Sequence, residues 1–447
     1  MLRKFFAISI YLLAVCSLHA AEINSQWVGG QEGQWGQAGN WSPAIVPDNS
    51  GGDTFTVTID ANSLGFDQAN IGLTQSRTVN QIICNGVEFG KWISGWVQLE
   101  LTDINGVTNY GNLEIEDEIN IFGNITNKTG ARLNGWFNIQ DSNLTNQAEA
   151  KVDATDGYID VHNGSVHNYG SIVTAFASGP CADKEFHNFG EIENYGGICS
   201  GRLSFTNYEV GIIKGYGKIY SNKIIANKGL IKSFGGDLIL QSQPEFGDDT
   251  NDNSGITNTG NLSNGPGTSL TITAWPPDVN NNGAIEVNAD GSVVFDCNLT
   301  NEPNGIIRLR GGTLASPRIT QTAGADFNGF GTIKGDLIIE PNSPEEPDSM
   351  VKLTGPSMAI GDMKISTGAS LQISDGQTLI TGQTTNNGTI HLIGGTAIFQ
   401  GGYTGDGQII NEAGEDRSQL DMNKDGIQDM QDFAVFADNW LWQASWY

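Results

Sequence analysis

The segments VHNYGSI (residues 166–172) and FHNFGEI (residues 186–192) are two copies of one short pattern. Each copy has an apolar residue, a spacer, an asparagine and a glycine soon after it. Successive asparagines in this frame are 24, 18, 19, 22, 20, 19, 20, 31, 23 and 20 residues apart. A period close to twenty residues is typical of a repeat protein. The asparagines are Asn85, Asn109, Asn127, Asn146, Asn168, Asn188, Asn207, Asn227, Asn258, Asn281 and Asn301.

The length and polarity of the repeat predict one coil of a parallel β-solenoid, and therefore an all-β fold. Twenty residues leave little room for a helix and a strand together, and the apolar residues alternate in short runs such as LEIEDEINIF (residues 113–122). Asparagine and glycine both tolerate left-handed backbone geometry, so the pair can turn the chain at a corner. Coils stacked about 4.8 Å apart let equivalent amides bond to each other. We therefore predict a ladder of asparagine side chains.

Composition agrees with a turn-rich β protein and restricts the partners. Glycine accounts for 59 of 447 residues, and charged residues for only 16%, against the usual quarter. The formal net charge of −28 disfavours nucleic acid and anionic membrane surfaces through repulsion. Cations are the natural counterpart of such a chain.

The first twenty residues predict a secretory signal peptide. Arg3 and Lys4 precede an apolar run from Phe5 to Val15, and small residues follow at Ala20 and Ala21. Cleavage near Ala20 would release a secreted protein, either extracellular or on the cell surface. No later stretch has the roughly 18 apolar residues of a membrane-spanning helix, so we expect no transmembrane segment in the mature chain.

The sequence divides the mature chain into three parts. We expect an N-terminal cap and first strands over residues 21–60, a solenoid over 61–415 with loops near 241–253 and 340–350, and a separate module over 418–447. Large aromatics can cover the open end of a solenoid, although a sugar-binding aromatic patch is the alternative. The cap contains Trp27, Trp35 and Trp41. Their segment resembles a tryptophan- and glycine-rich stretch at the mature start of large secreted bacterial β-helix proteins, which implies a right-handed β-helix.

Equivalent positions on neighbouring coils suggest which side chains stack. His167 and His187 each precede a repeat asparagine, so we expect a surface ladder, with a shared metal as the alternative. The position after the asparagine is aromatic in several coils, and packing between strands is favoured over sugar binding. These aromatics are Tyr110, Tyr169, Phe189 and Tyr208.

The four cysteines of the mature chain fall into two groups. Cys181 and Cys199 lie seven and eight residues before Asn188 and Asn207. Stacked positions about 5 Å apart fit the Cα separation of a disulfide, so we predict a Cys181–Cys199 bond. Cys84 and Cys297 are predicted to be buried free thiols.

The acidic segment DMNKDGIQDMQD (residues 421–432) predicts a calcium site. Oxygen ligands at loop positions 1, 3, 5, 9 and 12, a carbonyl at 7 and a glycine at 6 describe an EF-hand-type loop. Gly426 supplies the turn, and apolar residues between Phe433 and Leu441 recur with a helical period. The expected ligands of Ca²⁺ are Asp421, Asn423, Asp425, Ile427, Asp429 and Asp432.

This tail resembles one half of a type I dockerin, and it is similar to the short dockerin-like tails of many secreted planctomycete-type bacterial proteins. The resemblance covers about 27 residues and implies a cohesin-like or envelope protein as partner. A full dockerin has two calcium loops, whereas one is visible here. Gln428 also replaces the usual apolar residue at position 8.

Two functions are compatible with these features. The sequence favours a secreted or cell-surface, non-catalytic β-solenoid with a structural, adhesive or carbohydrate-associated role, anchored or assembled through its calcium-dependent tail. The alternative is a polysaccharide lyase or glycoside hydrolase of the β-helix type, supported by analogy of fold. No spacing selects an acid–base pair among the acids of the repeats, which include Asp153, Asp156, Asp160 and Asp183.

We expect the C-terminal loop to bind calcium. Calorimetric titration of residues 22–447 with Ca²⁺ should show one saturable event, because the aspartates repel one another until a cation occupies the loop. The double variant Asp421→Ala, Asp425→Ala should lose this event. Binding that persists in the variant would place the calcium elsewhere.

Overall fold

The computed structural model describes residues 21–49, 53–91, 97–103, 105–115, 119–155, 158–175, 180–243, 255–275, 278–340 and 349–412. The predicted signal peptide, all six predicted calcium ligands and most of both predicted loops lie outside these ranges. The chain divides into two compact units, Met1–Gly164 and Ser165–Tyr447, and each is described by itself.

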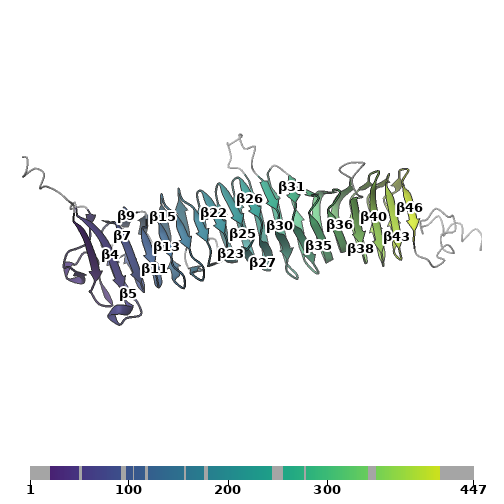
Figure 1. Cartoon of the computed structure of the whole chain (residues 1–447). Coiled ribbons are helices and arrows are strands. Elements are labelled where there is room, and N and C mark those ends of the chain that lie inside the picture. Colours follow the sequence, from purple (N-terminus) through teal and green to yellow (C-terminus); the bar gives the residue numbers. More distant parts are fainter. Residues whose placement is uncertain are drawn as a thin grey trace, which may run out of the picture. The chain divides into compact units, whose positions relative to one another are not determined.

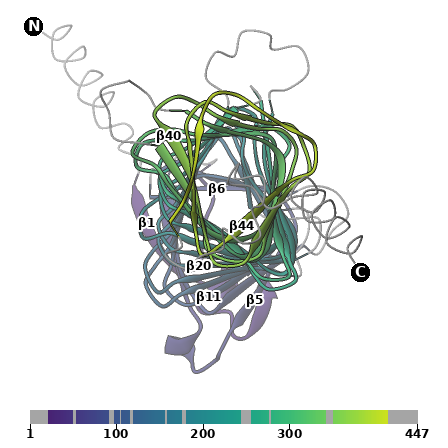
Figure 2. The same ribbon diagram turned by 90° about the vertical axis from the view of Figure 1, so that its right-hand side faces the viewer.

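Both units are parallel β-solenoids, and the chain makes about 15 turns in all. The described residues contain helical turns of only three residues, η1 (Ala38–Asn40) and η3 (Asn62–Leu64). The prediction of an all-β solenoid is therefore confirmed. Figure 1 shows the strands of each unit in succession, and in Figure 2 the coils are seen end on.

The strands are short, as a twenty-residue coil with several corners requires. Those of the first unit are β1 (Glu22–Trp27), β2 (Glu32–Gln34), β3 (Trp41–Ser42), β4 (Thr54–Asp60), β5 (Ala69–Leu73), β6 (Arg77–Val79), β7 (Gln81–Asn85), β8 (Val87–Lys91), β9 (Val97–Leu101), β10 (Val107–Asn109), β11 (Asn112–Ile115), β12 (Ile119–Phe122), β13 (Ile125–Asn127), β14 (Arg132–Gly135), β15 (Phe137–Gln140), β16 (Leu144–Asn146), β17 (Lys151–Ala154) and β18 (Ile159–His162).

Those of the second unit are β19 (Val166–Asn168), β20 (Ser171–Ala175), β21 (Pro180–Ala182), β22 (Glu185–Asn188), β23 (Glu191–Gly201), β24 (Ser204–Asn207), β25 (Ile212–Ser221), β26 (Ile224–Asn227), β27 (Leu230–Ser242), β28 (Gly255–Asn258), β29 (Asn261–Asn264), β30 (Ser269–Ala274), β31 (Asp278–Asn281), β32 (Ala284–Asn288), β33 (Ser292–Phe295), β34 (Asn298–Asn301), β35 (Ile306–Gln321), β36 (Asp326–Ile339), β37 (Ser349–Leu353), β38 (Ser357–Ile360), β39 (Met363–Ile365), β40 (Ala369–Ser374), β41 (Gln377–Ile380), β42 (Thr384–Asn386), β43 (Thr389–Ile393), β44 (Thr396–Phe399), β45 (Tyr403–Thr404) and β46 (Gln408–Asn411).

Buried residues of successive coils lie in register and form the core of each unit. In the second unit Phe186 is opposite Phe205, and Phe205 is opposite Ile225. The rings of Phe186 and Phe205 stack with centroids 4.7 Å apart. Alternate residues of each strand face the interior, so the apolar alternation seen in the sequence becomes one continuous apolar column.

Three buried tryptophans pack at the start of the first unit. Trp41 makes edge-to-face contacts with Trp27 and Trp35, at centroid distances of 5.1 and 4.8 Å. The indole N–H groups of Trp27, Trp35 and Trp41 donate to backbone carbonyls of Gly30, Pro47 and Trp35, respectively. Because all three rings are buried, their faces are not available to a sugar, and packing accounts for their presence.

The predicted asparagine ladder is present in both units. Each side-chain Nδ2 donates to the side-chain oxygen of the next coil, and its second hydrogen points at backbone carbonyls. In the first unit Asn109, Asn127 and Asn146 are joined at 2.8 and 2.9 Å. In the second unit the donor-to-acceptor distances are 2.7 to 2.9 Å along Asn168, Asn188, Asn207, Asn227, Asn258, Asn281, Asn301 and Gln321.

One asparagine of the predicted frame is outside the ladder. Asn109 is in register with Cys84 and not with Asn85. The Cys84 thiol lies 3.7 Å from the Asn109 side-chain oxygen, while Asn85 donates to Asp60. A shift of one residue reverses the face of a strand, so Asn85 is directed away from the ladder.

We expect Asn207→Ala to lower the free energy of unfolding by about 2–5 kcal/mol, because the side-chain N–H of Asn188 and the side-chain oxygen of Asn227 would both lose buried partners. Chemical denaturation monitored by circular dichroism measures the difference. The outward-facing neighbour Thr206 supplies the control variant Thr206→Ala, which should change stability by less than about 0.5 kcal/mol. Equal effects of the two substitutions would contradict a structural role for the ladder.

Candidate functional site

Three of the four predicted aromatic residues that follow ladder asparagines form a stack in the second unit, whereas Tyr110 of the first unit is outside it and exposed. Phe189 stacks on Tyr169 and on Tyr208, with centroid distances of 4.8 and 3.9 Å and interplanar angles of 8° and 11°. Phe189 is therefore covered on both faces, and Tyr169 and Tyr208 are each covered on one face. Because a sugar packs on the face of an aromatic ring, this geometry supports the predicted packing role.

The two predicted histidines also stack, with centroids 4.8 Å apart. His187 Nε2 lies 3.0 Å from a Glu185 carboxylate oxygen, and Nδ1 lies 3.3 Å from the Tyr208 hydroxyl. Burial lowers the pKa of His167, and His187 lowers it further, while Glu185 acts in the opposite sense. Among the described residues, no group of three or more His, Cys, Asp or Glu side chains could hold a metal ion.

The predicted Cys181–Cys199 bond is absent from the described strands, where Cys199 is a free thiol. Cys181 is in register with Ser200, one residue beyond Cys199. That single step places Cys199 in the interior and Cys181 on the outer side of the coil. Cys84 and Cys297 are buried free thiols, as predicted, and burial raises the pKa of Cys297 to about 11.

Asp153, one of the acids noted in the sequence, is held by ion pairs and a hydrogen bond within the first unit. Its carboxylate lies 2.8 Å from Arg132 and 3.1 Å from Lys151, and it accepts a 2.7 Å bond from the Thr155 hydroxyl. Burial acts to raise the pKa of Asp153, but the bonds from Thr155 and Lys151 outweigh it and lower the pKa. A glycosidase acid needs a raised pKa, so Asp153 does not fit that role.

A second set of aromatics, which sequence reasoning missed, marks another corner of the coils in the second unit. Tyr195 is in register with Tyr216, and their rings are 6.3 Å apart at an interplanar angle of 74°. Tyr195, Phe234 and Phe330 expose 40, 58 and 42% of their surface. Unlike the parallel rings of the stack, the rings of Tyr195 and Tyr216 meet edge to face.

A recurring dipeptide could have identified this corner. An aromatic residue followed by glycine occurs at the same phase of several coils, in NYGG, GYGK, SFGG and GFGT, which begin at residues 194, 215, 233 and 329. Because the glycines have no side chain, the backbones of neighbouring coils can approach each other closely at this corner. At Gly215, which has φ of 124°, a side chain would lie 1.8 Å from the Asn194 carbonyl oxygen.

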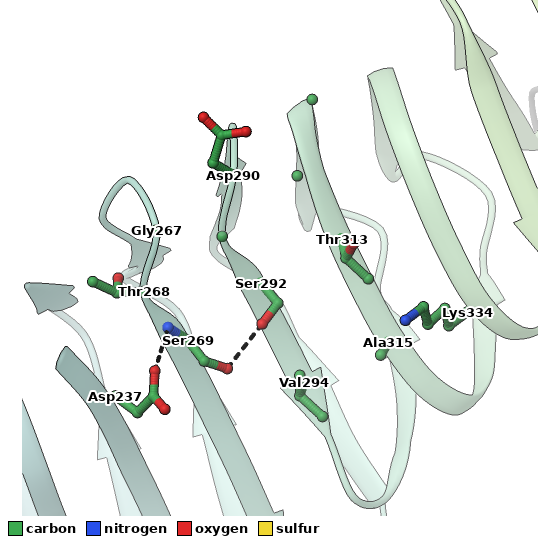
Figure 3. A pocket seen from close by; sticks show the side chains of 13 residues that line it. Asp237, Gly267, Thr268, Ser269, Asp290, Ser292, Val294, Thr313, Ala315 and Lys334 are labelled. Carbon is green, nitrogen blue, oxygen red and sulfur yellow. Dashed lines mark hydrogen bonds between the residues drawn. The ribbon is translucent and has the colours of Figure 1, made fainter.

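A hollow of about 490 Å³ opens beside this corner between Asp237 and Lys334 (Figure 3). Asp237 accepts a 2.9 Å hydrogen bond from the Ser269 backbone N–H, and the hydroxyls of Ser269 and Ser292 are 2.8 Å apart. Asp290 and Thr313 also line the hollow. Its wall therefore offers hydroxyls, two carboxylates and one ammonium group.

A second hollow of about 470 Å³ adjoins the first at Gly311, which lines both. Its apolar wall includes Phe330, Met358 and Leu379. A Cβ atom on Gly311 would lie 3.3 Å from the ring of Phe330, so this ring stands where the two hollows meet. We refer to the two hollows together as the corner groove.

No protein-family model, curated protein or solved structure matches this chain. In the part of the chain that the structure describes, no helix has the length and apolar character needed to cross a membrane.

We expect the Asp153 ion pairs to make the first unit sensitive to acid. Because the pKa of Asp153 is lowered in the folded state, its stabilisation is present above the unfolded value of about 3.9 and is lost as the pH falls through the folded value. Asp153→Asn should lower the free energy of unfolding by about 1–3 kcal/mol at pH 7, and the deficit should shrink as the pH falls through the lowered pKa of the folded state. Urea denaturation at pH 7 and at a series of lower pH values measures this change, with the exposed Glu100→Gln as control. A deficit independent of pH would contradict the role of the charge.

Proposed function

We propose that this protein is a non-catalytic, carbohydrate-associated β-solenoid that binds glycan in the corner groove. The observation that carries the proposal is the combination, in one groove, of the exposed ring of Phe330 and neighbouring apolar side chains with hydroxyls and carboxylates. Binding sites typically combine an apolar surface with a few polar groups that fix orientation.

The chemistry of sugars matches this combination. A pyranose ring has an apolar face of C–H groups, which packs on an aromatic or aliphatic surface such as Phe330 or Met358. Its hydroxyls project around the ring edge, where Ser292, Thr313 and Asp237 can donate or accept hydrogen bonds. Exposed aromatic surface on an otherwise polar solenoid also costs solubility, and such patches commonly mark interaction sites.

The catalytic alternative is a lyase or hydrolase of the β-helix type, and one observation favours it. Asp237 and Asp290 line the same hollow, and glycoside cleavage uses a pair of carboxylates. Asp237, however, accepts the Ser269 N–H and so links two coils. We give binding precedence because the groove continues beyond the two carboxylates into a second hollow, where Phe330, Met358 and Leu379 offer a surface for ring packing.

Export and attachment belong to the same proposal and rest on the sequence. Residues 1–20 have the charge and apolar run of a signal peptide, which supports a secreted or cell-surface location. The dockerin-like segment 418–447 would anchor the solenoid to a cohesin-like or envelope protein once Ca²⁺ orders its loop. Right-handed coils are the corresponding expectation for the fold.

We expect Phe330→Ala, which removes the aromatic ring that lines the groove, to weaken polysaccharide binding at least tenfold, which corresponds to about 1.4 kcal/mol. Depletion of the mature protein by a panel of insoluble neutral and acidic polysaccharides measures affinity. Tyr110→Ala is the control, since Tyr110 is also an exposed aromatic residue but does not line the groove.

Two results would count against the proposal. Failure of every polysaccharide to bind would exclude glycan association with this panel. Sustained release of soluble sugar, abolished by Asp237→Asn, would establish the catalytic alternative.

A further inference from the structure

The floor of the corner groove is a single row of side chains from successive coils. Ser269 is in register with Ser292, and Ser292 with Thr313. The row continues through Thr332 to Met358 and Leu379. All six positions line one or other hollow. The groove therefore runs across the strands, in the direction in which the coils stack.

The regular stacking of strands gives this row a constant repeat. Neighbouring strands lie about 4.8 Å apart, so the floor offers one side chain at each such step. The length of one sugar unit in an extended polysaccharide is close to this spacing. An unbranched chain lying along the groove could thus present one sugar to each coil.

The chemistry of the row changes along its length. The first four positions, from Ser269 to Thr332, carry hydroxyls, whereas Met358 and Leu379 are apolar. Phe330 stands at the junction of the two hollows. Asp237 precedes the row at the hydroxyl side, where its carboxylate is bonded to the Ser269 N–H. One part of the groove thus suits hydroxyl edges and the other suits ring faces.

We propose that the corner groove binds a linear, neutral polysaccharide that runs across the coils with about one sugar on each coil. This inference rests on the proposed function and specifies its ligand. Acidic polysaccharides are disfavoured because the chain carries a net charge of −28 and the first hollow contains two carboxylates against one ammonium group.

An extended peptide fits the same groove less well. Peptides recognised by sheets usually add a strand at an edge, where backbone groups are unpaired. Along this row the strands β30, β33, β35, β36, β38 and β41 are already paired with one another. A polymer crossing them meets side chains, and here four of the six floor positions carry hydroxyls.

The test is the dependence of affinity on ligand length. Calorimetry of the full mature chain with β-1,4-linked glucan, mannan and xylan oligomers, from dimer to octamer, would be compared with oligogalacturonates. We expect affinity for one neutral series to rise with each added sugar up to about six units, by more than a hundredfold in total, and then to level off. Oligogalacturonates should bind at least tenfold more weakly.

Substitution within the row locates the ligand. Thr313→Val removes a hydroxyl with little change in shape and should weaken hexamer binding about fivefold. The matched control is Thr206→Val, an outward-facing threonine on a strand outside the groove. Circular dichroism would verify that both variants keep the fold.

The outcomes separate this inference from the function on which it rests. Affinity that is equal for dimer and hexamer, or unchanged by Thr313→Val, would overturn the axial arrangement while leaving polysaccharide binding intact. Preference for the acidic series would overturn the neutral ligand. Absence of binding by every oligomer and polysaccharide would overturn both proposals.

Discussion

The hydrogen bond between stacked asparagine amides is the constraint on which the rest of the structure depends. A buried amide has two donors and an acceptor that must all be satisfied. In Asn207, Nδ2 reaches Asn227 at 2.9 Å and also backbone carbonyls of Gly211 and Leu230, while the oxygen accepts from Asn188. A coil displaced by one residue would lose these bonds together, so the ladder fixes the register of every strand that follows it.

Because the register is fixed, equivalent positions of successive coils lie in rows on the surface. The aromatic–glycine corner follows the ladder residue by seven residues at Tyr195 and Phe234, and by nine at Tyr216 and Phe330. In the coils of Tyr216 and Phe330 a turn separates the ladder residue from the next strand, and the corner residues still align. The corner groove beside them is therefore a consequence of the same amide bonds that order the interior.

The sequence alone predicted those features in which one type of residue recurs at the same position of successive coils. The ladder and the aromatic stack were predicted correctly because Asn and Tyr or Phe recur in the same frame. Asn85 and Cys181 were misplaced by one residue, and in a strand one residue reverses the exposed face. The groove floor was not predictable in this way, since Ser269, Thr313 and Met358 share neither residue type nor a local motif and meet only through register.

This division between repeating and varying positions bears on how such a protein acquires specificity. Core and ladder positions must stay apolar or amide, because each coil packs on the next and a single mismatch leaves buried groups unpaired. Outward-facing positions are not restricted in this way. The residue on the groove floor can therefore change from Thr332 to Met358 between neighbouring coils without disturbing the fold. Any preference for one polymer must therefore be encoded in the residues that break the repeat, and the length of polymer recognised is set by how many coils share the groove.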